Sequence, residues 1–375
     1  RFGGILVGLF ILFLYLICLY IRPQDWMPFV LNLPVIDMIL GVGLVVAFIS
    51  HIRQKRSLAL PQNLFILFFL ALVFLSNMVH GNLDAAFEQF IFYLKRAVPF
   101  LVFLFLIDSP QKLKSTIWFI LILTTYLASQ SIYQSAHGVG WAGQAIMAAQ
   151  TEMQDVHRVL WIGMWDGPNV LALLFVLAVP FALEFALGPY GFLSRAMSLV
   201  LACIFSYATV LTNSRGGFIA LAGAILAYFA IRFRSKRGIV IGIAIVTLVW
   251  TYLAPSRVSA LTIHESSAHE HSWLWEQGMT MLRSNPILGV GKGQFQAVSG
   301  GLQDRTHNNF VQNMAEMGLV GFFVYVSIIY LSFKGLVTVQ RTLKDRGQET
   351  LLLSLSRALF ASLVGYNIAT YFVTM

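Results

Sequence analysis

The chain has 375 residues, of which 58% are apolar and only 11% carry a charged side chain. Soluble domains carry about 25% charged residues, so the composition excludes a soluble globular protein, and the apolar excess excludes a disordered one. A net charge of +9 in so apolar a chain indicates the surplus of Lys and Arg that membrane proteins carry in their cytoplasmic loops, and not a nucleic-acid-binding surface.

Eleven apolar segments are long enough to cross a membrane, for which about 20 helical residues suffice. In chain order they cover residues 4–21, 30–50, 63–79, 86–107, 115–134, 168–188, 195–212, 216–232, 238–254, 309–333 and 350–372. The predicted fold class is therefore all-α, a polytopic transmembrane helical bundle of about 11–12 spans. Because the sequence starts without Met and stops inside an apolar run, we expect a further C-terminal helix.

The basic residues predict the orientation of these spans. With the N-terminus in the cytoplasm, fifteen Lys and Arg lie in the cytoplasmic loops and nine lie on the other side. The opposite orientation would place the basic cluster at 232–237 outside, against the positive-inside rule. We therefore expect a cytoplasmic N-terminus.

Two long loops, 135–167 and 255–308, face outward in this orientation, and long loops in compact proteins usually carry function. They divide the chain into N-terminal transmembrane helices (1–134), central transmembrane helices with the first loop (135–254), the large outward loop with short helices (255–308) and C-terminal transmembrane helices (309–375). Helical spacing predicts an interfacial helix over 82–100 that leads into a span, and a short helix over 273–282. The aromatic and histidine candidates in the two loops are Trp141, His157, Trp161, Trp165, His271, Trp273, Trp275 and His307.

Two motifs suggest sites that the residues do not support. HESSAHEH at 264–271 offers imidazoles and carboxylates to zinc, but its order is not HExxH and a solvated loop is the better interpretation. GVGKGQF at 289–295 lacks the glycine spacing and the Ser or Thr of a phosphate-binding loop, so it predicts a Gly-rich turn in which Lys292 adds positive potential. Both cysteines lie in apolar runs, which argues against a disulfide or a Cys-based metal site.

Arg215 is the first candidate for catalysis. It lies in LTNSRGGF, a short outward turn between two spans, where Gly216 and Gly217 open the next helix. A helix N-terminus with an arginine suits an anion, and the glycines would let backbone N–H groups approach it. The alternative is an arginine that extends to the membrane interface for solvation.

His307 is the second candidate, because it lies in RTHNNFVQN just before an outward helix end. Imidazole is the natural general base near neutral pH, and Asn308 could orient it or bind sugar hydroxyls. Arg305, two residues away, would disfavour the protonated imidazole. The alternative is an inert surface histidine.

HRVLWIGMWDGPNVLA at 157–172 supplies two further candidates, Arg158 for a phosphate and Asp166 for a substrate hydroxyl. Arg158 could instead pair with Asp155 or Glu152. Pro168 should begin the next helix with Gly167 as its N-cap.

Three stretches together resemble the bacterial O-antigen ligase and polymerase family: TNSRGGFIAL at 212–221, WLWEQGMTMLRSNPILGVGKGQF at 273–295 and THNNFVQNMAEMGLVGFFVYV at 306–326. The resemblance implies a membrane glycosyltransferase of the GT-C type. Such enzymes move a glycan from an undecaprenyl-diphosphate carrier to an acceptor on the periplasmic face of the bacterial inner membrane. Ligases of the family use lipid A-core, and polymerases use another lipid-linked glycan.

The resemblance also assigns residues. The family's arginine maps to Arg215 and its histidine to His307, as catalytic groups. A second family arginine is replaced here by His271. Either Arg257, Arg283 or Arg305 substitutes for it, or the second phosphate contact is weaker. The residues expected to bind the donor diphosphate are Arg215, Arg158, Arg305 and Lys292. The residues expected to bind the acceptor or its sugars are Asn308, Asp166, His271 and Trp275.

The residues fit this chemistry without a cofactor or a metal ion. Arginines in a low-dielectric cleft can stabilise a leaving diphosphate. A single displacement assisted by one base implies inversion at the anomeric carbon, since no carboxylate pair is placed for a double displacement. We expect lipid-linked glycan, glycan acceptor and membrane lipids as partners, and no nucleic acid. The alternatives are an O-antigen or exopolysaccharide polymerase, a lipid-linked sugar flippase or transporter using mid-span charges such as Glu184 and Arg357, and an envelope scaffold.

Overall fold

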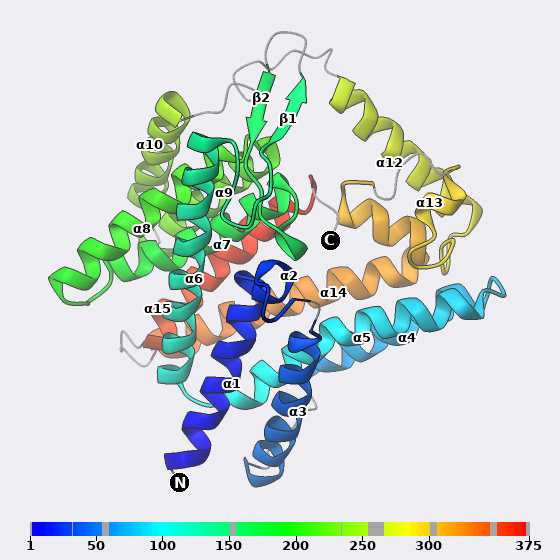
Figure 1. Ribbon diagram of the computed structural model, residues 1–375, viewed down its shortest axis with the longest axis horizontal. Coiled ribbons are helices and arrows are strands. Elements are labelled where there is room, and N and C mark those ends of the chain that lie inside the picture. The colour runs from blue at the N-terminus through cyan, green and yellow to red at the C-terminus, as the bar shows by residue number, and fades with distance from the viewer. Residues whose placement is uncertain are drawn as a thin grey trace. The chain divides into compact units, whose positions relative to one another are not determined.

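The structure, a computed structural model, describes residues 2–31, 33–54, 60–150, 155–233, 235–253, 266–300, 306–345 and 351–372 (Figure 1). Helices dominate these ranges, which confirms the all-α prediction. Nine of the helices in the described ranges are long and apolar enough to cross a membrane. The chain is therefore a multi-pass membrane protein.

Every one of the eleven predicted segments coincides with a helix. They are α1 (Phe2–Tyr20), α3 (Val35–Gln54), α4 (Pro61–Met78), α5 (Leu83–Leu106), α6 (Pro110–His137), α7 (Pro168–Leu187), α8 (Phe192–Leu211), α9 (Arg215–Phe233), α10 (Lys236–Leu253), α14 (Asn309–Asp345) and α15 (Leu351–Ala369). Nine of these eleven helices are the candidate membrane spans. The other two are α10 and α1, whose apolar stretch is the shorter Val7–Tyr20.

The loops contain short elements, some of which the sequence did not predict. They are α2 (Pro23–Trp26), the 3₁₀ helix η1 (Gly163–Trp165), α12 (Ser266–Ser284), α13 (Phe295–Val298) and the strands β1 (Met147–Gln150) and β2 (Asp155–Arg158). The two strands pair antiparallel, with Met147 opposite Arg158. α12 starts earlier than the predicted 273 and includes residues 266–271, so six of the eight residues of HESSAHEH are helical and not a loop.

Local signals explain several helix ends. α7 begins at Pro168 with Gly167 as its N-cap, as predicted, because the fixed φ of proline and its missing N–H suit the first helical position. α12 ends just before Asn285 and Pro286. The helix predicted over 82–100 is the first part of α5, which continues through Pro99 to Leu106.

The chain forms two compact units, each assembled from distant segments. The first contains residues 1–47, 104–261 and 336–369, and the second contains residues 48–103, 262–335 and 370–375. The sequential division into four regions therefore does not coincide with these units.

In the first unit, α7 is the central helix and packs on α8, α9 and α15, while α15 also packs on α9 (Figure 1). The helix is mostly apolar, and residues such as Leu171, Phe175 and Phe185 are fully buried. Small residues permit the close packing, since a Cβ at Gly365 of α15 would lie 2.8 Å from the side chain of Val176. A helix surrounded in this way is held by packing along its whole length.

In the second unit, α12 packs through a buried apolar cluster onto the beginning of α14. The cluster consists of Leu274, Met281, Val290, Phe295 and Ala315. α14 is broken at Gly318, which has φ 64° and ψ −164°. The predicted span over 309–333 is thus two helical pieces that meet at Gly318.

Candidate functional site

The turn that carries Arg215 is held by its own side chains. Ser214 caps α9, because its Oγ accepts a hydrogen bond of 3.1 Å from the N–H of Gly217. Asn213 adopts the left-handed conformation with φ 48°, and Thr212 Oγ1 donates to Thr209 O at 2.6 Å. This fixed turn places half-buried Arg215 as the first residue of α9.

Gly217 serves helix packing. A Cβ there would lie 2.5 Å from the Cβ of Ala172 in α7, so only glycine lets α7 and α9 approach this closely. Its N–H is already bound by Ser214. The expectation that this glycine lets a ligand reach a backbone N–H group is therefore wrong for Gly217.

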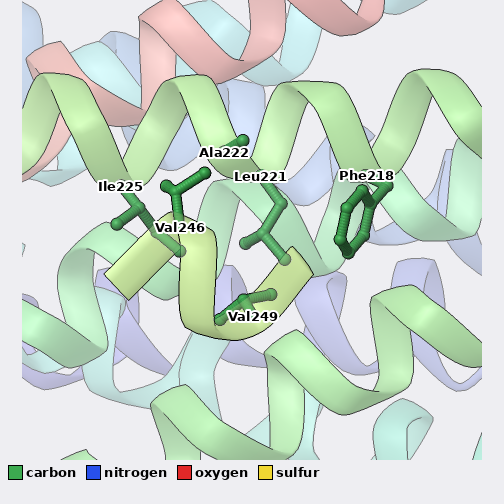
Figure 2. A pocket seen from close by; sticks show the side chains of 6 residues that line it. All are labelled: Phe218, Leu221, Ala222, Ile225, Val246 and Val249. Carbon is green, nitrogen blue, oxygen red and sulfur yellow. The ribbon is translucent and has the colours of Figure 1, made fainter. Parts of the chain in front are cut away.

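The face of α9 toward α10 is purely apolar. Figure 2 shows Val246 and Val249 of α10 beside Phe218, Leu221 and Ile225 of α9, and these side chains line a small pocket with Ala222. Phe218, one turn after Arg215, is also near Trp250, with 5.4 Å between ring centroids. The side chains that line this pocket offer only apolar contact, so the polar chemistry of this region comes from the turn and from what docks on it.

Arg158 docks on that turn. Its Nε donates to Thr212 O at 3.1 Å and its Nη2 donates to Asn169 Oδ1 at 2.7 Å. Asn213 Nδ2 donates in turn to His157 O at 2.8 Å. The structure thus brings Arg158 to the backbone beside Arg215, which no spacing in the sequence could show, because the two segments are 54 residues apart.

The tryptophans of this loop hold it in place. Trp161 and Trp165 are buried, and their Nε1 atoms donate to Tyr20 O at 2.9 Å and Leu19 O at 3.3 Å. Their interpretation as functional candidates is replaced by a packing role at the end of α1. Asp166 follows them with an exposed side chain, and its N–H donates to Gly163 O at 3.1 Å.

The histidine turn belongs to the second unit. His307 is half-buried and adopts the left-handed conformation with φ 54°. Asn308 is the N-cap of α14, because its Oδ1 accepts from Phe310 N at 2.9 Å and from Val311 N at 3.2 Å. This oxygen therefore fixes the helix start beside His307, a capping role that the position of the asparagine before an apolar helix could have indicated.

The Gly-rich turn at 289–295 docks on the break in α14. Leu319 N and Val320 N donate to Pro286 O at 2.8 Å and Ile287 O at 3.3 Å instead of to carbonyls within α14. The carbonyls of Ala315 and Glu316 that are freed by the break accept from Val290 N and Gly291 N, each at 3.0 Å. Gly289 thus permits contact between two backbones: a Cβ there would lie 2.3 Å from the carbonyl carbon of Glu316.

Lys292 lies at the end of this docked segment and is only 5% exposed. Its Nζ is 2.8 Å from Glu316 Oε2. Burial alone would lower the pKa of Lys292, but the charge of Glu316 and the phenol of Tyr93 raise it above its ordinary value. Lys292 is therefore a charged, paired group within the protein.

Three predicted residues are less informative. Trp275 is partly exposed on α12, and Arg305 lies outside the described residues. His271 is part of α12, but its side chain is outside the described ones. Among the residues that the structure does describe, no group of three His, Cys, Asp or Glu side chains could hold a metal ion; most of HESSAHEH is not covered by that statement.

The site residues thus form two groups. Arg158, Asp166 and Arg215 belong to the first unit, and Trp275, Lys292, His307 and Asn308 to the second. A comparison with curated proteins finds no match. The family model described as O-Antigen ligase matches residues 199–326, which include Arg215, Lys292 and His307. Residues 199–326 of this multi-pass membrane protein are therefore similar to the O-antigen ligase family.

Proposed function

We propose that the protein transfers a glycan from an undecaprenyl-diphosphate carrier to an acceptor at the periplasmic face of the bacterial inner membrane, as an O-antigen ligase with lipid A-core as acceptor. The observation that carries the proposal is the docking of Arg158 on the Arg215 turn. Arg158 Nε lies 3.1 Å from Thr212 O, three residues before Arg215. Two guanidinium-bearing segments are thus joined at a helix N-terminus within and beside the family domain.

Arg215 and Arg158 are the residues we assign to the donor diphosphate. Charge develops on the diphosphate as the glycosidic bond breaks, and guanidinium groups stabilise it through paired, charge-assisted hydrogen bonds. Arg305 stays a prediction for the same role. Lys292 is ion-paired to Glu316, which offsets much of the positive potential it would offer a phosphate.

His307 is the residue we assign as the base. The acceptor hydroxyl oxygen attacks the anomeric carbon, its proton passes to the imidazole, and the bond to the carrier diphosphate breaks, with inversion. No metal ion takes part in this scheme. Support comes from the fixed turn that holds the backbone of His307 just before α14. Asp166, His271, Trp275 and Asn308 are the proposed acceptor-side residues.

A transporter for lipid-linked sugars has less support. It would use intramembrane charges along a path, and Glu184 was the clearest candidate. Glu184 is fully buried and accepts hydrogen bonds from Tyr228 Oη at 3.0 Å and Arg232 Nη1 at 2.9 Å. A carboxylate enclosed by these two partners suits a structural role better than a path for substrate.

The test is transfer by purified protein in nanodiscs, with an undecaprenyl-diphosphate-linked glycan as donor and lipid A-core as acceptor. Glycan on lipid A-core supports a ligase. Chain extension on a second lipid-linked glycan would identify a polymerase instead, and movement of donor between leaflets without transfer would identify a transporter.

The orientation has its own test in a variant that lacks Cys18 and Cys203. A cysteine at Gly300 should react with an impermeant maleimide from the periplasm, and a cysteine at Lys236 should react only after the membrane is opened. Labelling at Lys236 from the periplasm would contradict the proposed placement of the site.

A further inference from the structure

A continuous chain of hydrogen bonds leads from the buried Lys292–Glu316 ion pair to the histidine turn. Glu316 Oε1 accepts from Gln312 Nε2 at 2.5 Å. Gln312 Oε1 accepts in turn from the backbone N–H of Thr306 at 2.8 Å. Thr306 directly precedes His307, and its Oγ1 donates to Asn308 O at 2.8 Å, which closes the turn around the histidine.

The ion pair determines which way the donors and acceptors point along this series of hydrogen bonds. A glutamine amide has one donor end and one acceptor end. Because Glu316 is a carboxylate, it accepts only and binds the donor end of Gln312. The acceptor end is thereby turned toward the N–H of Thr306. Lys292 Nζ lies 2.8 Å from the other carboxylate oxygen, so the ion pair holds in place the carboxylate that orients the amide.

A second arm connects the same lysine to the first turn of α14. Lys292 Nζ donates to Asn313 Oδ1 at 3.3 Å, and Asn313 Nδ2 donates to Asn309 O at 2.7 Å. The two arms end on Thr306 and Asn309, one residue before and two residues after His307. Gln312, Asn313 and Glu316 are all buried, so the connection is shielded from solvent.

Lys292 is itself held by α4. Its N–H donates to Ser76 Oγ at 3.1 Å, and its carbonyl accepts from Asn77 Nδ2 at 3.0 Å. Ser76 and Asn77 are buried neighbours near the end of α4. Lys292 is thus held through its backbone N–H, its carbonyl and its ammonium group. These contacts fix its position within the second unit more firmly than a surface ion pair alone would.

We propose that the Lys292–Glu316 ion pair is a positioning device that fixes the backbone turn of His307 through Gln312 and Asn313. The inference rests on the proposed function in taking His307 as the base. Its physical reason is that a displacement of about 1 Å at a reacting group lowers turnover by about 10²-fold. The left-handed conformation of His307 has to be maintained by its surroundings, and the two hydrogen-bonded arms supply this restraint.

The test measures the reaction of individual histidines with diethyl pyrocarbonate by mass spectrometry, on the whole protein in nanodiscs. Gln312→Met removes the link to Thr306 and leaves the ion pair in place. We expect His307 to react roughly threefold faster or more, because the turn opens locally. His80 is the internal reference, since its Nε2 binds Gly289 O at 2.7 Å and reports whether the docked segment stays in place.

Two further variants sharpen the result. Lys292→Met combined with Glu316→Met removes both charges together, so that no unpaired charge stays buried, and should also accelerate His307 but not His80. Gln62→Met is the matched control: it removes a glutamine hydrogen bond to Leu331 O of 3.3 Å in the same unit and should change neither rate.

The same variants are assayed for glycan transfer. In Gln312→Met, kcat should fall by about 10–10²-fold while KM for the donor stays within about twofold. Equal His307 rates in the wild type and in both variants would overturn the proposal. An increase in the reaction rate of His80 equal to that of His307 would also overturn it. The Lys292–Glu316 pair would then only hold the docked segment at 289–295 in place. If the wild type transfers no glycan, the proposed function fails. The reaction rates of His307 and His80 with diethyl pyrocarbonate still show whether the ion pair fixes the histidine turn.

Discussion

Arg232 Nη1 donates a hydrogen bond of 2.9 Å to the fully buried carboxylate of Glu184, 48 residues away in the sequence. Arg232 also donates to Leu187 O at 2.6 Å, and Tyr228 binds the second carboxylate oxygen. The pair joins the ends of α7 and α9, so it is part of the packing of the first unit.

Arg232→Met should therefore destabilise the protein strongly. It leaves Glu184 buried without its cation, which costs about 3–5 kcal/mol. Unfolding in mixed micelles, followed by tryptophan fluorescence, would measure the loss. Arg237→Met, an exposed arginine at the start of α10, is the control and should have little effect. Equal stabilities of the two variants would refute a structural role for the pair.

Gly318→Ala should disturb the break in α14. Alanine is strained at φ 64°, and its Cβ would lie 2.3 Å from Ile287 O. The backbone strain alone costs about 1–3 kcal/mol. Gly335→Ala in the same helix is the control, because its Cβ would meet only Gln62 Nε2 at an ordinary 3.5 Å. Thermal unfolding should separate the two, and a Gly318→Ala protein as stable as the wild type would contradict the role of the break.

Arg215→Lys should impair transfer although it keeps the charge. A lysine cannot form the paired, planar hydrogen bonds that a guanidinium offers a phosphate. Arg215→Ala should lower kcat by about 10²–10³-fold and weaken donor binding as well. Transfer rates and binding of the lipid-linked donor would be measured together, with Arg237→Lys as the control. Full activity of Arg215→Lys would leave only a general electrostatic role.

His307→Asn isolates the imidazole from its backbone. Asparagine tolerates the left-handed conformation better than alanine does, so the turn should persist. Loss of the base should lower kcat by about 10²–10⁴-fold while donor binding stays near that of the wild type. His137→Asn, at the end of α6, should be fully active. If His307→Asn and the wild type transfer glycan equally fast at saturating acceptor, the base is a different group, and Asp166 becomes the next candidate.

Transfer should survive an excess of EDTA. In the proposed scheme arginines stabilise the leaving diphosphate, so no divalent ion is required. The measurement is the rate of transfer by purified protein before and after chelation. Loss of activity that zinc restores would instead favour a metal site at HESSAHEH.

The sequence by itself determined the membrane spans and several helix ends. Eleven apolar segments became eleven helices, and Gly167 with Pro168 marked the start of α7. These features depend on interactions among residues near one another in the chain and on the apolar length that a membrane requires. The family resemblance of the segments around Arg215 and His307 was likewise visible in the residues alone.

Only the tertiary structure decided what the polar residues contact. Arg158 meets Thr212, Glu184 meets Arg232, and Lys292 meets Glu316, and each partner is 24 to 54 residues away. The Gly-rich turn looked like a connector, yet it supplies the hydrogen bonds that α14 gives up at Gly318. Because a buried charge or a freed backbone group must find a partner in space, such pairings follow from the packing of distant segments, which local patterns do not specify.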